Sequence, residues 1–172
     1  LRYLVDQVVD TPDMYIGDAS LLTTTAQTIL PDPRKSLSVE SGAPIQTILS
    51  EQIRRHPEHV AVVDVHRTWS YGELDAASSC LAHCLHRDGI GTHDVVAVYG
   101  CRTYALVVAL LGVLKAGAAF VILDSEYPAA FLSAQVRVAK PCAWIQLEAA
   151  GALPEPLDNI AAHAACRLEI PF

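Results

Sequence analysis

A cluster of cysteines and histidines is the first candidate for chemistry. Cys80, His83, Cys84 and His86 lie close together in the chain. On a helix, Cys80, His83 and Cys84 would share one face, because residues three and four apart are neighbours. A structural zinc usually takes four ligands from two separated pairs, and no second pair is evident. Cysteine beside an apolar stripe behaves as a small hydrophobic residue, so the pattern favours core packing over a metal site.

Lys115 and two acids are the next candidates. Lys115 follows an apolar stretch. A buried lysine can act as a nucleophile or hold a phosphate, whereas a lysine in the last turn of a helix stabilises the helix dipole. We favour the dipole role. Asp124 and Glu126 follow an apolar strand, at the end of a sheet where ligands bind. We interpret them as solvated acids of a turn.

Short nucleotide-binding and nucleophile motifs do not identify a site. Gly89-Ile90-Gly91 stands between a predicted helix and a strand, whereas a dinucleotide fingerprint stands between a strand and a helix and has a third glycine. A turn is the better interpretation. The sequence contains neither a G-x-x-x-x-G-K-[ST] loop nor a G-x-S-x-G elbow. We therefore expect no catalytic, cofactor-binding or metal-binding residue in this chain.

The elements that would position these residues follow from periodicity and capping. Ser70 and Glu73 form a capping box at the start of a helix, and Gly117 suits the position after a helix end. Thr24 and Gln27 have the same spacing in the leader. Helices are expected at 24–30, 44–56, 70–88, 103–116, 129–139 and 156–164, after a first helix that ends before Thr11-Pro12-Asp13. Strands are expected at 61–65, 68–69, 95–99, 119–123, 143–147 and 167–170, with the first two forming a hairpin.

Alternating apolar strands and helices predict an α/β fold, a parallel sheet with helices on both faces. We divide the chain into a leader, 1–43, which has too few apolar residues to fold alone and should dock elsewhere, and a regular region, 44–172. In the leader, Pro31-Asp32-Pro33 stops a helix and a linker begins at Ser36. The chain starts at Leu1, so we expect a processed, excised or incomplete N-terminus.

Composition excludes several classes of protein. The 172 residues are 52% hydrophobic and 18% charged, which is incompatible with a disordered chain. A net charge of −7 argues against binding to nucleic acid or anionic membranes. The longest uncharged apolar stretch, 103–114, is shorter than the roughly 20 residues of a membrane span. Five cysteines, an odd number, and no visible signal peptide favour reduced thiols in a cytoplasmic protein.

Two motifs resemble the core motifs of adenylate-forming enzymes. Residues 69–74, WSYGEL, resemble the first, L-[ST]-Y-x-E-L. Residues 114–124, LKAGAAFVILD, resemble the second, L-K-A-G-x-A-[YF]-V-P-[IL]-D, and Tyr127-Pro128 follow in the family's place. The region 44–66 is similar to the start of adenylation domains of nonribosomal peptide synthetases. Leader and tail segments resemble fungal α-aminoadipate reductases: Ile16-Gly17, Leu22-Thr23, 30–33, 138–141, 148–151 and 167–171.

The chain also departs from the family pattern. Ile122 replaces the usual proline, and Phe131 stands where an arginine commonly follows Tyr127-Pro128. The phosphate loop, the motifs for adenine and ribose, the late catalytic lysine, the carrier serine motif and the reductase glycine motif have no counterpart here. By this resemblance, residues 44–172 are the incomplete N-terminal portion of an adenylation domain, truncated before the phosphate loop.

The resemblance implies a reaction for the parent protein. ATP and Mg²⁺ activate a carboxylate as an acyl-adenylate, a phosphopantetheine thiol takes the acyl group, and NADPH reduces the thioester to an aldehyde, as in lysine biosynthesis. The implied partners are the rest of the adenylation domain, carrier and reductase domains, and a small carboxylic or amino acid. We expect this chain alone to be inactive. A non-catalytic α/β binding or interaction module is the alternative, and a flavodoxin-like ligand-binding domain is a third hypothesis.

Overall fold

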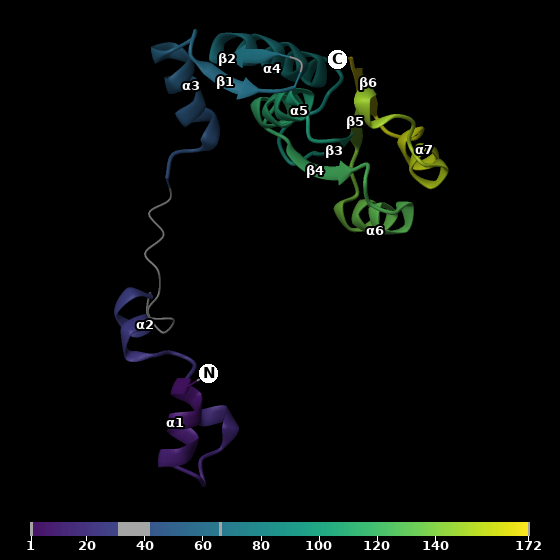
Figure 1. Ribbon diagram of the computed structural model, residues 1–172. Coiled ribbons are helices and arrows are strands. Elements are labelled where there is room, and N and C mark those ends of the chain that lie inside the picture. The colour runs from purple at the N-terminus through teal and green to yellow at the C-terminus, as the bar shows by residue number, and fades with distance from the viewer. Residues whose placement is uncertain (1, 31–41, 66, 172) are drawn as a thin grey trace. The chain divides into compact units, whose positions relative to one another are not determined.

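The computed structural model describes residues 2–30, 42–65 and 67–171 (Figure 1). The chain divides into two compact units, Leu1–Gly42 and Ala43–Phe172. The predicted helix stop at Pro31-Asp32-Pro33 and most of the predicted linker after Ser36 lie outside the described residues.

The N-terminal unit consists of short helices with little buried surface. They are α1 (Arg2–Asp10), the 3-10 turn η1 (Ile16–Asp18) and α2 (Thr24–Ile29). The side chain of Gln7 donates to the carbonyl of Ser20 and accepts from its N–H, both at 2.9 Å, which holds the turn against α1. The helix cap lies one residue before the predicted one, since the hydroxyl of Thr23 accepts from the N–H of Ala26.

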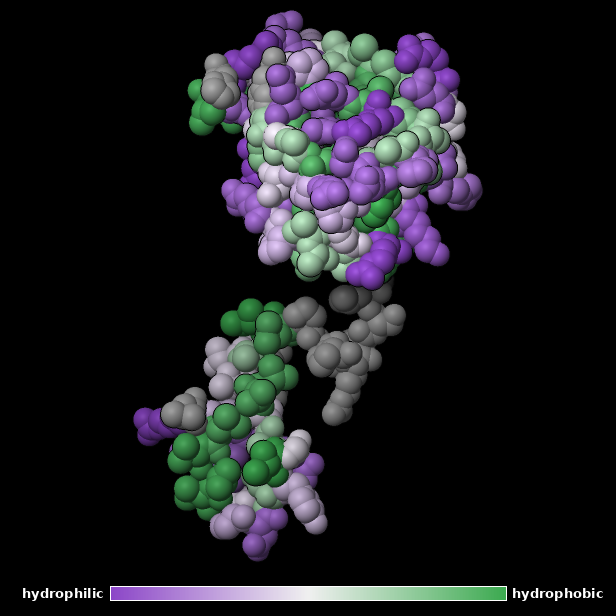
Figure 2. Space-filling model, turned by 90° about the vertical axis from the view of Figure 1, so that its right-hand side faces the viewer, coloured by the Kyte–Doolittle hydropathy of each residue, from purple (hydrophilic) through white to green (hydrophobic). Residues whose placement is uncertain are grey.

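This unit exposes most of its apolar side chains. None of the residues of α1 is buried. Figure 2 shows hydrophobic atoms gathered over the smaller, lower group of atoms, which is this unit. The exposed apolar side chains are Val5, Val8, Val9, Tyr15, Ile16, Leu21, Ile29 and Leu30.

The second unit contains a four-stranded parallel sheet in the order β4-β3-β5-β6. Neighbouring strands pair in parallel, from Val95 opposite Ala119 in β3 and β4 to Leu147 opposite Ile170 in β5 and β6. The sheet confirms the predicted α/β class. Its strands are β3 (Val95–Gly100), β4 (Ala119–Asp124), β5 (Ala143–Leu147) and β6 (Cys166–Ile170).

Helices cover both faces of this sheet (Figure 1). On one face, α4 and α5 pack over Val96, Val98 and Ile145, and on the other α6 and α7 pack over Tyr99 and Trp144. The turn η2 (Glu148–Ala150) follows β5. The covering helices are α4 (Tyr71–Arg87), α5 (Tyr104–Lys115), α6 (Ala129–Ala139) and α7 (Glu155–Ala161).

A helix and a hairpin precede the sheet. Helix α3 (Ile45–Arg55) begins after Pro44, which is its N-cap rather than its first helical residue. Strands β1 (Val60–Val63) and β2 (Thr68–Ser70) pair antiparallel, as the predicted hairpin requires. The capping box of Ser70 and Glu73 is present at the start of α4. Helix α7 is shorter than predicted and ends at Ala161.

The edge strand β4 is less covered than the prediction of two buried faces implies. Val121 and Leu123 face the cluster under α6 and α7. Phe120 and Ile122 alternate with them and are each 37% exposed. The buried cluster under α4 and α5 is centred on β3 and β5, so the helices leave this edge partly open. Within the described residues, no helix is long and apolar enough to cross a membrane.

Candidate functional site

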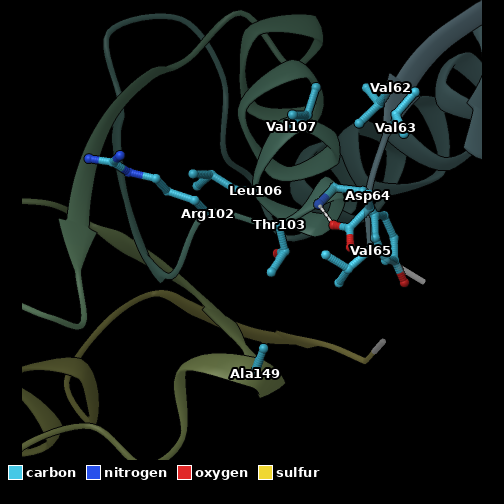
Figure 3. Close-up of a pocket in the computed structure, with 10 residues that line it drawn as sticks. Val62, Val63, Asp64, Val65, Arg102, Thr103, Leu106, Val107 and Ala149 are labelled. Carbon is cyan, nitrogen blue, oxygen red and sulfur yellow. Dashed lines mark hydrogen bonds between the residues drawn. The ribbon is translucent and has the colours of Figure 1, made fainter. Parts of the chain in front are cut away.

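A cavity opens at the carboxyl end of the sheet, between the places where β3 and β5 end (Figure 3). Helix α5 follows β3 on one face, and η2 and α7 follow β5 toward the other. The chain continues from β3 to β4 on one side and from β5 to β6 on the other, so the strand order reverses between β3 and β5. Ligands of open α/β sheets bind at such a reversal. The cavity has a volume of about 490 Å³. It is lined by Val62, Val63, Asp64, Val65, Arg102, Thr103, Tyr104, Leu106, Val107 and Ala149.

The carboxylate of Asp64 occupies the start of α5. Its Oδ2 accepts a hydrogen bond from the N–H of Tyr104 at 2.8 Å, drawn as a dashed line in Figure 3. The hairpin loop holds Asp64 in place, because its N–H donates to the carbonyl of Arg67 at 3.0 Å. The helix N-terminus carries partial positive charge. The carboxylate of Asp64, which lies forty positions before Tyr104 in the chain, balances that charge.

The remaining polar groups of the cavity differ in orientation. Arg102 is exposed, and its guanidinium points away from the other lining side chains in Figure 3. The hydroxyl oxygen of Thr103 is buried and has no hydrogen-bond partner among the residues the structure describes. The lining of the cavity is therefore mostly apolar. Its polar groups include the Asp64 carboxylate, which is hydrogen-bonded at the start of α5, and the buried Thr103 hydroxyl, which has no hydrogen-bond partner among the described residues.

A stack of side chains fixes the hairpin to the start of α5. The rings of Trp69 and Tyr104 stack with centroids 4.5 Å apart. The guanidinium carbon of Arg67 lies 3.9 Å from the Trp69 ring centroid, and Arg67 also contacts Glu73 at 2.6 Å. Trp69 stands at the first position of the first core motif, and its contacts with Tyr104 and Arg67 join the hairpin to the start of α5 and, through the contact between Arg67 and Glu73, to α4.

Lys115 forms the densest polar cluster of the second unit. Its Nζ donates to Oδ1 of Asp75 at 2.6 Å, to Oγ of Ser78 at 2.8 Å and to Oγ of Ser79 at 2.9 Å. It also reaches the carbonyl of Asp75 at 3.1 Å. The side chain of Lys115 is 18% exposed. The wholly buried Ser78 donates to the carbonyl of Leu74 at 2.7 Å.

Lys115 lies in the last turn of α5, as its predicted dipole role requires, and this cluster gives its ammonium group further partners. The ammonium group is neither a free nucleophile nor only a complement to the helix dipole, because it ties the last turn of α5 to the first turns of α4. Asp75 and Ser78 were missed by the sequence analysis. Their only signal is that they follow the capping box on the same helix, and the partner that gives them a role is distant in sequence.

The cysteine–histidine group does not converge on one site. Cys80, His83 and His86 are exposed and Cys84 is half-buried. Exposure of Cys80 contradicts its predicted role in core packing, because the buried stripe of α4 lies on an adjacent face. Among the described residues, no group of three or more His, Cys, Asp or Glu side chains could hold a metal ion.

The other candidate residues stabilise turns. Asp124 accepts from the N–H of Glu126 at 3.0 Å, which caps the turn after β4. The N–H of Gly91 donates to Asp94 at 2.9 Å, and Gly89 has a φ of +84°, as a left-handed turn residue. These contacts match the predicted turns.

Two thiols lie in environments that disfavour their charged form. The Sγ of Cys166 donates to Oδ2 of Asp88 at 3.3 Å. Burial and this hydrogen bond raise the pKa of Cys166 to about 11, and the same bond lowers the pKa of Asp88. Burial also raises the pKa of Cys142. Neither thiol is suited to act as a nucleophile, since reactivity needs the thiolate.

Comparisons with known proteins place these features in one family. The sequence pattern described as AMP-binding enzyme matches residues 49–169. The L-2-aminoadipate reductase of Schizosaccharomyces pombe is 41% identical over 148 residues, covering 80% of this chain and 10% of that protein. Surfactin synthase subunit 1 of Bacillus subtilis is 36% identical over 127 residues, covering 73% of this chain and 4% of that protein.

The structural comparison agrees at the level of the fold. The crystal structure of an anthranilate CoA ligase, in complex with anthranoyl-AMP, aligns with a TM-score of 0.65 and 14% identity. The alignment covers 73% of this chain and 24% of that one. The chain therefore spans about a tenth of the aminoadipate reductases and about a quarter of this ligase.

Proposed function

This chain belongs to the AMP-binding enzyme family, and we propose that it forms the leading α/β layer of a domain that activates a carboxylic acid with ATP, in a protein related to L-2-aminoadipate reductase. The observation that carries the proposal is the 41% identity to the fission yeast enzyme. That identity extends over both core motifs, and Lys115 links the helices that carry them.

The matches to aminoadipate reductases support the proposed relation to these enzymes in particular. Matches to these enzymes extend over as much as 92% of this chain, whereas those to the peptide synthetases extend over up to 73%. The added coverage reaches into the N-terminal unit. We accordingly propose aminoadipate as the substrate class of the whole protein, lysine biosynthesis as its setting and the cytoplasm as its location, where its five free cysteines would stay reduced.

The family implies ATP and Mg²⁺, and the start of α5 does not fit a phosphate. The Asp64 carboxylate lies at the start of α5 and would repel a phosphate there. The described side chains include no metal-binding group of three or more. We propose that the contribution of this chain is positional and that the contacts to ATP, phosphopantetheine and NADPH belong to other parts of the protein.

We propose structural roles for particular residues of this chain. Lys115, Asp75 and Ser78 fix α5 against α4, and the Trp69–Tyr104 stack fixes the hairpin to both. These contacts set the positions of the loops at the carboxyl end of the sheet, where the rest of an adenylate-forming domain must meet this layer. We propose the remainder of that domain, with carrier and reductase domains, as its partners.

A segment replacement tests the proposal. Residues 43–171 would replace the matching segment of the fission yeast L-2-aminoadipate reductase, and the hybrid would be expressed in a fission yeast strain that lacks the enzyme. We expect growth without lysine and reduction of aminoadipate by the purified hybrid. A hybrid that carries the matching segment of surfactin synthase subunit 1 is the control, and should support slower growth because its contacts to the rest of the domain differ.

The outcomes separate the proposed adenylate-forming role from the proposed relation to aminoadipate reductases. A folded, full-length hybrid that neither grows nor reduces aminoadipate contradicts the assignment to aminoadipate reductases. Equal activity of the surfactin synthase hybrid leaves the adenylate-forming role standing and contradicts the special relation to aminoadipate reductases.

A further inference from the structure

The start of α5 is capped by a residue from another part of the chain. The carboxylate of Asp64 accepts a hydrogen bond from the N–H of Tyr104 at 2.8 Å. Helices usually begin with a Ser, Thr, Asp or Asn residue whose own side chain accepts from an N–H of the first turn. In α5 that position belongs to Thr103, yet its side chain makes no capping hydrogen bond. Asp64 therefore takes a role that the local sequence offers to Thr103.

Thr103 has the backbone of a helix cap without its side-chain contact. Its φ of −131° and ψ of 171° are the extended values typical of that position. The N–H of Leu106 donates to the carbonyl of Thr103 at 3.1 Å, and the Thr103 side chain points away from α5 in Figure 3. The hydroxyl oxygen is buried and lacks a hydrogen-bond partner among the described residues. A buried hydroxyl without a partner is unfavourable, so rotation of this side chain toward the helix would remove that cost.

The neighbours of Asp64 are weakly attached to the rest of the second unit. Val63 is 74% exposed and Val65 is 92% exposed, although both line the cavity. The strand β2 that follows is anchored differently, because the ring of Trp69 stacks on that of Tyr104. Residues 63–65 can therefore move without displacing β2 from the start of α5.

We propose that α5 has two alternative caps, the carboxylate of Asp64 and the hydroxyl of Thr103, and that exchange between them releases residues 63–65 from the wall of the cavity. With Asp64 in place, its charge compensates the partial positive charge of the helix start. When residues 63–65 move out, Thr103 rotates and its hydroxyl accepts from the N–H of Ala105 or Leu106, the groups that a capping side chain reaches. The helix start is capped in both states, which brings their free energies closer together and lets the cavity open.

The χ1 rotamer of Thr103 tests the exchange directly. Three-bond scalar couplings, measured by NMR on the full 172-residue chain, report this angle. We expect one rotamer in the unaltered chain and a different one in Asp64→Ala, where the hydroxyl takes over the helix start. If Asp64→Ala does not fold, Asp64→Asn replaces it. Asparagine keeps a neutral acceptor of the same shape, so this variant should show a mixture of the two rotamers.

Urea unfolding followed by circular dichroism tests the exchange through stability. Thr103→Val keeps the shape of the side chain and removes the hydroxyl. In the unaltered chain it should leave the unfolding midpoint unchanged or raise it, because the hydroxyl has no partner there to lose. In Asp64→Ala it should lower the midpoint and raise the equilibrium constant for unfolding about fivefold, as the loss of a helix cap does. Thr92→Val, on an exposed threonine before β3, is the matched control and should shift both chains equally.

Two results would overturn the proposal. One is the same Thr103 rotamer in folded chains with and without the Asp64 carboxylate. The other is a Thr103→Val effect of equal size in both chains, since additive effects mean that the two side chains act independently. Both measurements use this chain alone, so neither result depends on the proposed function.

Discussion

At the scale of single residues, one lysine holds two helices together. Lys115 donates to a carboxylate, a carbonyl and two hydroxyls of α4. The hydroxyl of the buried Ser78 accepts from Lys115 and donates to Leu74, so the cluster is satisfied in both directions. A hydrogen bond to a charged group contributes more than one between neutral groups. Lys115 is accordingly a structural residue within the second core motif.

Removal of this ammonium group should destabilise the second unit. Lys115→Met keeps the aliphatic stem but leaves Ser78 without its charged donor, and we expect a loss of about 2 kcal/mol in the free energy of unfolding. Urea unfolding followed by circular dichroism measures it. Lys140→Met, on an exposed lysine at the end of α6, should change stability by less than about 0.5 kcal/mol. Equal stability of both variants would contradict the role of Lys115.

The thiols should differ sharply in reactivity. Cys80 is exposed, whereas the pKa of Cys166 is raised to about 11 by burial and its bond to Asp88. At pH 8 only roughly one thousandth of Cys166 would be thiolate. Iodoacetamide labelling followed by peptide mass spectrometry should find Cys80 modified long before Cys166. In urea the two rates should become similar. Equal rates in the folded chain would refute this description of Cys166.

At the scale of elements, α4 begins with a reciprocal cap. The hydroxyl of Ser70 accepts from the N–H of Glu73, and the Glu73 carboxylate accepts from the N–H of Ser70. The hydrogen bond from the Ser70 backbone lowers the pKa of Glu73, and Arg67 adds to the effect. The charged form is thus favoured in the folded state. Its contribution to stability is fully present above the unfolded pKa, near 4.5, and is lost as the pH falls through the lower folded pKa.

This cap predicts that the difference in stability between the Glu73→Gln variant and the unaltered chain depends on pH. Glu73→Gln keeps the shape of the side chain but removes the charge, so it should be less stable than the unaltered chain at pH 7. The difference should shrink as the pH falls below about 4.5. Thermal unfolding from pH 7 to pH 3 measures it. Glu126→Gln, at an exposed turn, is the matched control and should follow the unaltered chain. A difference that stays constant with pH would show that the charge of Glu73 has no role.

The contact between α4 and α5 depends on a glycine. A Cβ on Gly112 would lie 2.6 Å from Cδ2 and 3.0 Å from Cβ of Leu81, closer than real side chains approach. Helix propensity alone favours alanine over glycine by about 1 kcal/mol. The clash should outweigh it, so Gly112→Ala should lose about 1–3 kcal/mol. Gly91→Ala, where a Cβ meets nothing closer than 3.9 Å, should be near neutral. A stabilised Gly112→Ala variant would contradict this packing.

At the scale of the whole molecule, local sequence patterns predicted the helices and strands but not the contacts between them. The continuous apolar strands and the capping box are local features, and the sheet and α4 follow from them. The prediction placed the cysteines of α4 in the core, whereas Cys80 is exposed and Ser78 and Leu85 are buried there. Ser78 is buried because its hydroxyl is satisfied by Leu74 and Lys115, and no local pattern reveals that.

The candidate site was the least predictable part. The cavity at the end of the sheet depends on Asp64, from the hairpin, meeting the start of α5. The sequence places these residues forty positions apart and gives no signal that connects them. By contrast, the family could be predicted, because its two motifs are local and occur in the expected order.

The most direct test of the central claim is ATP–pyrophosphate exchange, measured with aminoadipate on two preparations side by side. One is the 172-residue chain alone, and the other is the fission yeast reductase that carries residues 43–171 in place of its own segment. We expect no exchange by the chain alone and aminoadipate-dependent exchange by the hybrid. Exchange by the isolated chain, or a folded hybrid without exchange, would contradict the claim that this chain is a positioning layer of an adenylate-forming domain.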